Sequence, residues 1–171
     1  MSVHTCPRCE LRFELQAELE DHLVRDHRFD PDKLRPHPVP APRPGARLVV
    51  VVGNHTLLSD RLRERVASAI AGADADIHVV VPVKHDDEFD VAFWRGRVLA
   101  ERVVGPHAKA TVDAGVEDPV VLVERSLHGA HADHVILSTF PAGLSRWLES
   151  DVAGRLRRAL GLPVETVVAE G

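Results

Sequence analysis

Three runs rich in valine, leucine and isoleucine constrain the fold of this chain more than any other feature of its sequence. They are Leu48–Val52, Ile77–Val83 and His134–Ser138. A strand that is apolar at nearly every position must be covered on both faces, which is typical of the parallel sheets of α/β proteins. We therefore expect these three runs to be buried, parallel strands.

The segments around these strands have the apolar spacing and the start and stop residues of helices. The predicted helices cover Ser59–Ala71, Val98–Val112, Asp118–Leu127 and Ser145–Leu160, and a last strand covers Val164–Ala169. This order of strands and helices predicts an α/β fold with an open, doubly wound, mostly parallel sheet. The pattern leaves one strand unplaced, which is either missing or hidden in Val120–Val123.

The N-terminal segment carries the only two cysteines of the chain and two histidines that lie close together. Cys6, Cys9, His22 and His27 have the spacing Cys-x2-Cys-x12-His-x4-His. Two thiolates and two imidazoles at this spacing suit a tetrahedral zinc ion, and four protein ligands leave no position open for catalysis. With Phe13 and Leu19 at the core positions, the segment resembles the two-Cys two-His zinc finger family. The resemblance implies a small ββα unit around one structural zinc ion.

The finger lacks the residues that usually read DNA. The base-reading positions of its helix fall on Leu15, Glu18 and Asp21, and none of these is a usual partner of a purine edge. Residues 1–30 hold four arginines against seven acidic residues, and the whole chain has a net charge of −5. This balance disfavours binding to phosphate backbones. We expect a structural or protein-contact role for the finger. The alternative is a nucleic-acid-binding regulator with a dimerising α/β domain.

A proline-rich segment separates the finger from the α/β part. Residues 31–46 have proline at every second position from 36 to 44, which favours a stiff polyproline II spacer over helix or strand. We therefore divide the chain into a zinc finger (1–30), a linker (31–46) and an α/β domain (47–171), and expect the finger to move independently. No apolar run is long enough for a membrane span and the start lacks the features of a signal peptide, so we expect a cytoplasmic protein.

Two stretches of the α/β part resemble the universal stress protein superfamily. One is Leu48–Thr56 (LVVVVGNHT), a strand that runs into a loop. The other is Ala132–Leu148 (ADHVILSTFPAGLSRWL), a strand, a loop and a helix start, followed later by LPVETVV at 162–168. The resemblance implies a universal stress protein-like fold, a stress-type role and a homodimer formed through the final strand, Val164–Val168.

Both loops follow the carboxyl ends of strands, where open α/β sheets bind their ligands. A nucleotide or another small anion would meet the N-terminus of the helix that follows the second loop. The opposing interpretation is that Ser145 only caps this helix, that Arg146 is solvated and that Trp147 belongs to the core. The candidate residues are Asn54 and Thr56 on the ribose or base side, and Ser138, Thr139, Ser145 and Arg146 on the phosphate side.

Support for ATP as the ligand is weaker. ATP-binding members of the superfamily carry a Gly-x2-Gly-x9-Gly-Ser/Thr pattern after the penultimate strand, and this chain has only Gly143 and Gly154 there, at another spacing. The close backbone approach that those glycines permit is therefore missing. The sequence also contains no Walker loop and no GxGxxG motif.

These features together predict a non-enzymatic, zinc-binding sensor or adaptor of the stress type. His55 lies in the first crevice loop. Ser138, His55 and Asp133 are the residue types of a catalytic triad, but no G-x-S-x-G motif accompanies them to support that role. An enzyme of the wider nucleotide-handling α/β group, using the same crevice, remains a further alternative.

Overall fold

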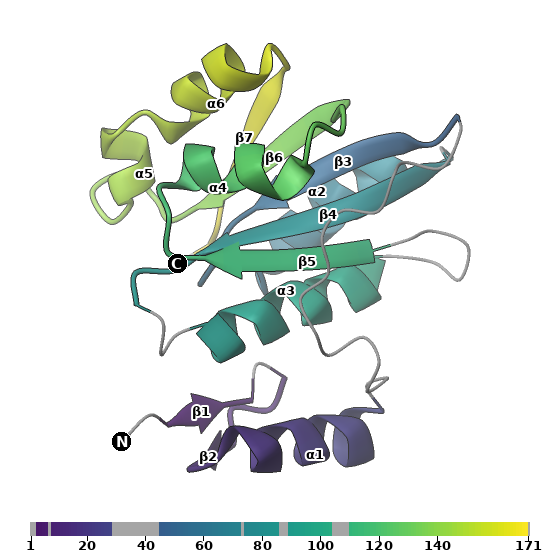
Figure 1. Ribbon diagram of the computed structural model, residues 1–171, viewed down its shortest axis with the longest axis vertical. Helices are drawn as coiled ribbons and strands as arrows, with labels where there is room; N and C mark the ends of the chain where they lie inside the picture. The colour runs from purple at the N-terminus through teal and green to yellow at the C-terminus, as the bar shows by residue number, and fades with distance from the viewer. Residues whose placement is uncertain are drawn as a thin grey trace.

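The computed structural model of the chain describes residues 3–6, 8–28, 45–72, 74–85, 89–103 and 110–170. It contains a small two-stranded sheet with one helix and a larger five-stranded sheet with helices on both faces (Figure 1). The predicted polyproline spacer lies outside the described residues over 31–44. Among the described residues, no helix combines the length and the apolar character needed to cross a membrane.

The large sheet has five strands, and every pair of neighbours is parallel. This confirms the predicted α/β fold with a parallel, doubly wound sheet. In spatial order the strands are β5 (Ala110–Gly115), β4 (Ala75–Pro82), β3 (Arg47–Val52), β6 (His134–Thr139) and β7 (Val164–Val168). The chain first adds β4 and β5 on one side of β3 and then adds β6 and β7 on the other side, so β3 and β6 are neighbours.

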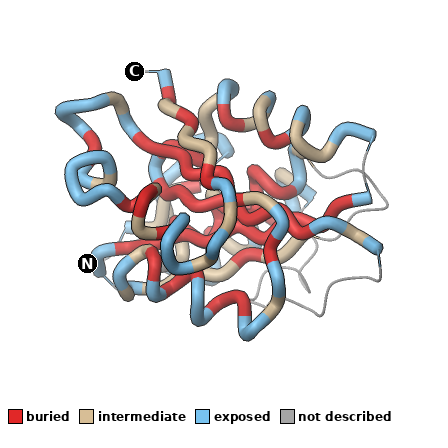
Figure 2. Tube along the Cα trace, turned by 90° about the horizontal axis from the view of Figure 1, so that it is seen from above, coloured by how far each residue is buried: buried red, intermediate tan, exposed pale blue. Residues whose placement is uncertain are grey.

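Helices cover both faces of this sheet because successive strand residues point to opposite sides. Val49 and Val51 share a hydrophobic cluster with one pair of helices, and Val50 and Val52 share another cluster with the second pair. Figure 2 shows the buried strands in the interior of the molecule, between partly exposed outer segments. The first pair is α2 (Asp60–Ile70) and α3 (Phe89–Val103), and the second is α4 (Pro119–Leu127) and α6 (Val152–Leu160).

Two of the predicted helices begin at the residues that the sequence indicates. The Ser59 side chain accepts a hydrogen bond from the backbone of Leu62 at the start of α2. Asp118 likewise accepts a hydrogen bond from Val120, and Pro119 occupies the first turn of α4. Both starts follow the ordinary preference of helix N-termini for Ser, Asp and Pro.

Two of the predicted helices are wrong in extent. The predicted helix Val98–Val112 is the end of α3 and, after residues that the structure does not describe, the strand β5. This is the strand that the sequence left unplaced, and Val120–Val123 is helical instead. β5 is an edge strand in which the buried Val112 and Ala114 alternate with partly buried residues, so it lacks the continuous apolar run of the central strands.

The predicted helix Ser145–Leu160 is interrupted. It consists of a short α5 (Arg146–Glu149) and the longer α6, which starts after Asp151. Asp151 has a positive φ of 48° and its carboxylate accepts a hydrogen bond from Gly154. A side chain that satisfies a helix start in this way ends one helix and begins the next.

The N-terminal unit has the ββα order of the predicted finger. Its strands β1 (His4–Thr5) and β2 (Arg12–Phe13) are antiparallel, and α1 (Gln16–His27) follows them. Leu19 and Leu23 of α1 are fully buried.

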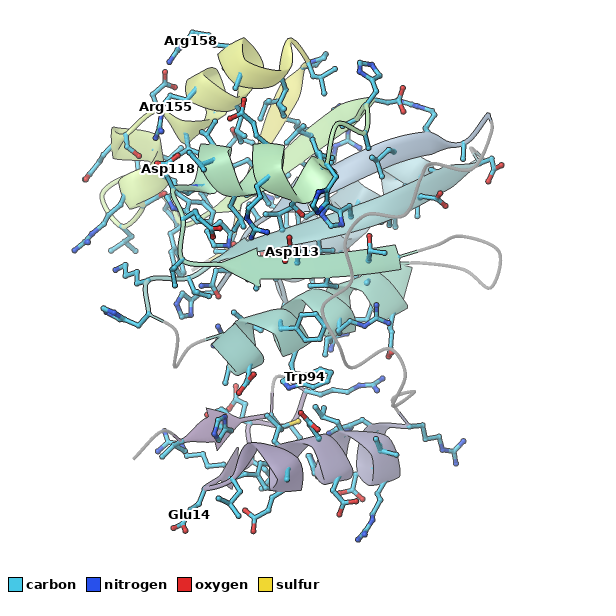
Figure 3. The ribbon with its side chains drawn as sticks, in the orientation of Figure 1. Glu14, Trp94, Asp113, Asp118, Arg155 and Arg158 are labelled. Atoms are coloured by element: carbon cyan, nitrogen blue, oxygen red, sulfur yellow. The ribbon has the colours of Figure 1, made fainter. Side chains whose placement is uncertain are left out.

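The finger packs against α3 of the α/β part. Cys6, Leu19 and Leu23 belong to the same hydrophobic cluster as Trp94, which is 1% exposed. Figure 3 shows Trp94 between α3 and the finger. His4 Nδ1 also lies 3.7 Å from a carboxylate oxygen of Asp90 in α3. The expectation of an independently moving finger does not fit this packing, because the two units share one core.

Candidate functional site

The four predicted metal ligands come together in the finger. One potential ligand atom from each of Cys6, Cys9, His22 and His27 lies within 4.8 Å of every other. The turn between β1 and β2 brings the two cysteines together, with Cys6 donating its backbone N–H to Leu11 and accepting a hydrogen bond from Glu10. Among the described residues, no other group of three or more His, Cys, Asp or Glu side chains comes close enough together to hold a metal ion.

The chemistry of this cluster fits zinc. The Nε2 atom of His27 is buried and has no hydrogen-bond partner among the described residues, as expected of an atom that faces a metal. Burial lowers the pKa of His27 and so favours the neutral imidazole that a metal ligand must be. Burial raises the pKa of the Cys6 thiol, so a neighbouring cation is needed to hold Cys6 as a thiolate.

Asp26 is a residue of this centre that the sequence interpretation missed. Its carboxylate lies 2.6 Å from Nδ1 of His22, and the Nε2 atom of the same ring lies 3.2 Å from Sγ of Cys9. A carboxylate on one ring nitrogen fixes the tautomer and directs the other nitrogen to the metal. The spacing of Asp26, one helical turn after His22, is the signal that would have found it.

The exposed side of α1 carries acidic and apolar groups at the base-reading positions. Leu15 is 61% exposed. Glu18 accepts a hydrogen bond from the Leu15 backbone, and Asp21 pairs with Arg25 at 3.0 Å. These contacts lie within α1 and its first turn. None of the three positions presents a side-chain hydrogen-bond donor to a base edge.

A cavity of about 340 Å³ opens at the carboxyl ends of the large sheet. Loops that follow β3, β4, β5 and β6 contribute to its wall. The loops that follow β3 and β6 both line it, and these two strands are neighbours where the strand order reverses, which is the usual ligand position of doubly wound sheets. All six residues proposed from the sequence line it, namely Asn54, Thr56, Ser138, Thr139, Ser145 and Arg146.

Most of the polar floor of this cavity is bonded within the protein. Asn54 donates to the Pro82 carbonyl at 2.9 Å and accepts from Arg95 of α3 at 3.0 Å. Ser138 donates to the Thr56 hydroxyl at 2.7 Å, which ties the β6 end to the β3 loop. Asn54, Thr56 and Ser138 therefore hold the loops in position, and their side-chain amide and hydroxyl groups already form hydrogen bonds within the protein.

The phosphate side of the prediction is divided. Ser145 caps α5 by accepting a hydrogen bond from Leu148, as the opposing interpretation expects. Trp147 packs partly against the core beside α6, yet it also lines the cavity. Arg146 lines the cavity and is exposed, and its guanidinium has no hydrogen bond or ion pair with the part of the chain that the structure describes. Because α5 has only four residues, its terminus is not a candidate anion site, and the positively charged group on this side of the cavity is the guanidinium of Arg146.

The sequence interpretation missed several residues of the cavity wall. Lys84 follows β4, and the rule that placed the other loops at strand ends could have found it. Glu117 follows β5, the strand that was not recognised, and it is paired with Arg125 at 2.7 Å. The remaining lining residues that the sequence analysis did not propose as ligand contacts are Pro82, Val83, Pro119, Phe140, Leu144 and Trp147.

The catalytic triad drawn from the sequence is not assembled. Asp133 precedes β6 and accepts a hydrogen bond from the backbone of Leu48, at the amino ends of the strands. Ser138 and His55 lie at the opposite, carboxyl ends. The length of β6 therefore separates Asp133 from the other two side chains.

Comparison with known proteins supports the fold. No protein-family model matches the sequence, and no curated protein matches it. A crystal structure of a universal stress protein in complex with cAMP is similar to 74% of this chain and to 99% of that chain, with a TM-score of 0.53 and 16% sequence identity. The five parallel strands and their flanking helices therefore have a universal stress protein-like fold.

Proposed function

We propose that this protein is a zinc-containing sensor or adaptor of the stress type that binds a nucleotide in the cavity of its α/β part. The single observation that carries the proposal is the convergence of the two loops that follow β3 and β6 on one cavity at the switch point of the sheet. A similar fold holds cAMP in a universal stress protein, which supports a nucleotide as the class of ligand.

The zinc has a structural role in this proposal. Cys6, Cys9, His22 and His27 would together supply four protein ligands to the ion, which would leave no open position for a substrate. The finger ordered by this ion covers α3 at Trp94. The proposal therefore gives the finger a contact within its own chain, and it includes no catalysed reaction.

Two further parts of the proposal concern assembly and location. β7 is an edge strand of the sheet, and we propose that two copies pair through this edge to form a homodimer. We place the protein in the cytoplasm, where reduced thiols remain available to a metal ion.

Native mass spectrometry of the freshly purified chain, followed by calorimetric titration with nucleotides, tests the proposal. The expected results are one zinc per chain, a dimer, and saturable binding of a nucleotide. Arg146→Gln should weaken nucleotide binding about tenfold, because hydrogen bonds to a charged group are lost. A matched control is Arg63→Gln, which removes a partly exposed arginine of α2 that pairs with Asp60 in the same helix.

The outcomes separate the parts of the proposal. Failure of every nucleotide to bind the zinc-loaded chain at millimolar concentration would remove the sensor function. Absence of zinc from a reduced sample with intact thiols would remove the metal centre. Equal loss of affinity in Arg146→Gln and Arg63→Gln would show that the binding is not in this cavity.

A further inference from the structure

We propose that the cavity selects a nucleoside monophosphate, with the base stacked against His55 and Phe140 and the phosphate paired with Arg146. This inference rests on the proposed function and specifies the ligand of the same cavity. Three observations carry it: a pair of exposed rings at the mouth, the balance of charge in the wall, and the closure of the nearby helix starts.

The rings of His55 and Phe140 come from different loops and lie face to face. Their centroids are 6.4 Å apart, and their planes differ by 25°. Both residues line the cavity, and Phe140 is 40% exposed although it is a large apolar side chain. A nearly parallel pair of accessible rings offers a flat surface on which a nucleic-acid base can stack. Leu144, 72% exposed and also in the wall, adds apolar surface beside the rings.

The charges of the wall favour an anion. Lys84 and Arg146 are its two cations, and Glu117 is its one carboxylate among the described lining residues. Arg125 pairs with Glu117 and so neutralises this carboxylate. Arg146 is the guanidinium whose hydrogen-bonding groups face no described partner, and a guanidinium binds phosphate with two parallel hydrogen bonds.

The helix starts beyond β6 do not provide a cradle for a longer phosphate chain. Ser145 already occupies the start of α5 by accepting a hydrogen bond from Leu148. The carboxylate of Asp151 occupies the start of α6, and a Cβ at Gly154 would lie only 2.2 Å from an oxygen of this carboxylate. A negatively charged cap repels further phosphates, whereas a helix start that holds a phosphate chain needs free backbone N–H groups. One phosphate monoester, which carries about two negative charges, balances the two cations of the wall, Lys84 and Arg146.

Calorimetric titration of the zinc-loaded chain with AMP, ATP and ribose 5-phosphate tests the inference. We expect AMP to bind at least tenfold more tightly than ribose 5-phosphate, which has the phosphate without the base. We expect ATP to bind no more tightly than AMP. If the affinity for ATP is at least ten times the affinity for AMP, the assignment to a monophosphate is wrong. If ribose 5-phosphate equals AMP, the base makes no stacking contact.

Two variants separate the ring contact from the phosphate contact. Phe140→Leu keeps an apolar side chain and removes the ring, so it should weaken AMP about tenfold and leave ribose 5-phosphate unchanged. Arg146→Gln should weaken both ligands, and Arg63→Gln should weaken neither. If Phe140→Leu binds AMP with unchanged affinity, the stacking inference is overturned while the proposed function stands. If none of the three ligands nor any other nucleotide binds, the proposed function itself fails.

Discussion

The buried histidine of β4 makes the stability of this protein depend on pH in a direction that can be calculated. His78 is fully buried. Its ring nitrogens lie within hydrogen-bond distance of the hydroxyls of Thr111 and Ser126. Burial lowers the pKa of His78 from 6.5 to about 3, and the neighbouring His128 contributes in the same direction. The folded protein therefore holds this ring neutral at pH values where the unfolded chain binds a proton.

The sign and the size follow from this difference in proton binding. Because the pKa is lower in the folded state, the contribution is complete above about pH 6.5 and is lost as the pH falls toward 3. The loss is about 1.4 kcal/mol for each pH unit below the unfolded pKa. Between pH 7.5 and pH 5.0 the free energy of unfolding should therefore fall by about 2 kcal/mol through His78 alone. In a chain of this size this corresponds to roughly 4–8 °C in Tm.

Urea unfolding at pH 7.5 and pH 5.0 measures this contribution. In His78→Gln the amide can still bond to the hydroxyls but does not titrate, so its loss of stability on acidification should be smaller by about 2 kcal/mol than that of the natural chain. Protonation of the zinc ligands weakens both proteins alike and cancels in the comparison. His131→Gln, which changes an exposed histidine, should keep the full dependence. Equal acid sensitivity in the natural chain and in His78→Gln would refute the reasoning. If His78→Gln does not fold, nuclear magnetic resonance of the His78 ring in the natural chain should show no protonation down to pH 4.

Three further predictions follow from the packing. Gly96→Ala should destabilise the protein by about 1–3 kcal/mol in urea unfolding, because the new Cβ would lie 2.6 Å from the Val112 side chain; a neutral substitution would show that α3 can move away from the sheet. In a Trp147→Phe background, chelation of zinc should shift the fluorescence of Trp94 to the red as the finger leaves α3. Unchanged emission would mean that the finger covers α3 without metal. Asn54→Ala should cost about 1–3 kcal/mol, since the Pro82 carbonyl and the Arg95 guanidinium lose a buried partner, and it should lower affinity in the cavity while zinc content stays at one per chain.

The central part of the fold could be predicted from the sequence because its signals are local. The strands β3, β4 and β6 are covered on both faces, so each contains a run of mostly apolar residues, and Ser59 and Asp118 mark helix starts by their own side chains. β5 could not be found in this way. It lies at an edge of the sheet, where partial exposure removes the continuous apolar pattern.

The two candidate sites differ in the same respect. The four predicted metal ligands lie within one short segment, so their spacing along the chain gives the whole set. The cavity is assembled from four loops, and its wall depends on the order of the strands. The ring pair of His55 and Phe140 depends on two loops that are 85 residues apart in the sequence. No local pattern carries the information that these rings face each other.

The contact between the finger and α3 has a consequence for how this protein can vary. A unit attached only by a linker can be exchanged between proteins without change elsewhere, but Leu19 and Leu23 share a core with Trp94. A larger or smaller side chain on one side must be compensated on the other, so we expect these positions to covary among relatives that carry a finger. Relatives without a finger should have a polar residue in place of Trp94, since an uncovered indole would favour aggregation.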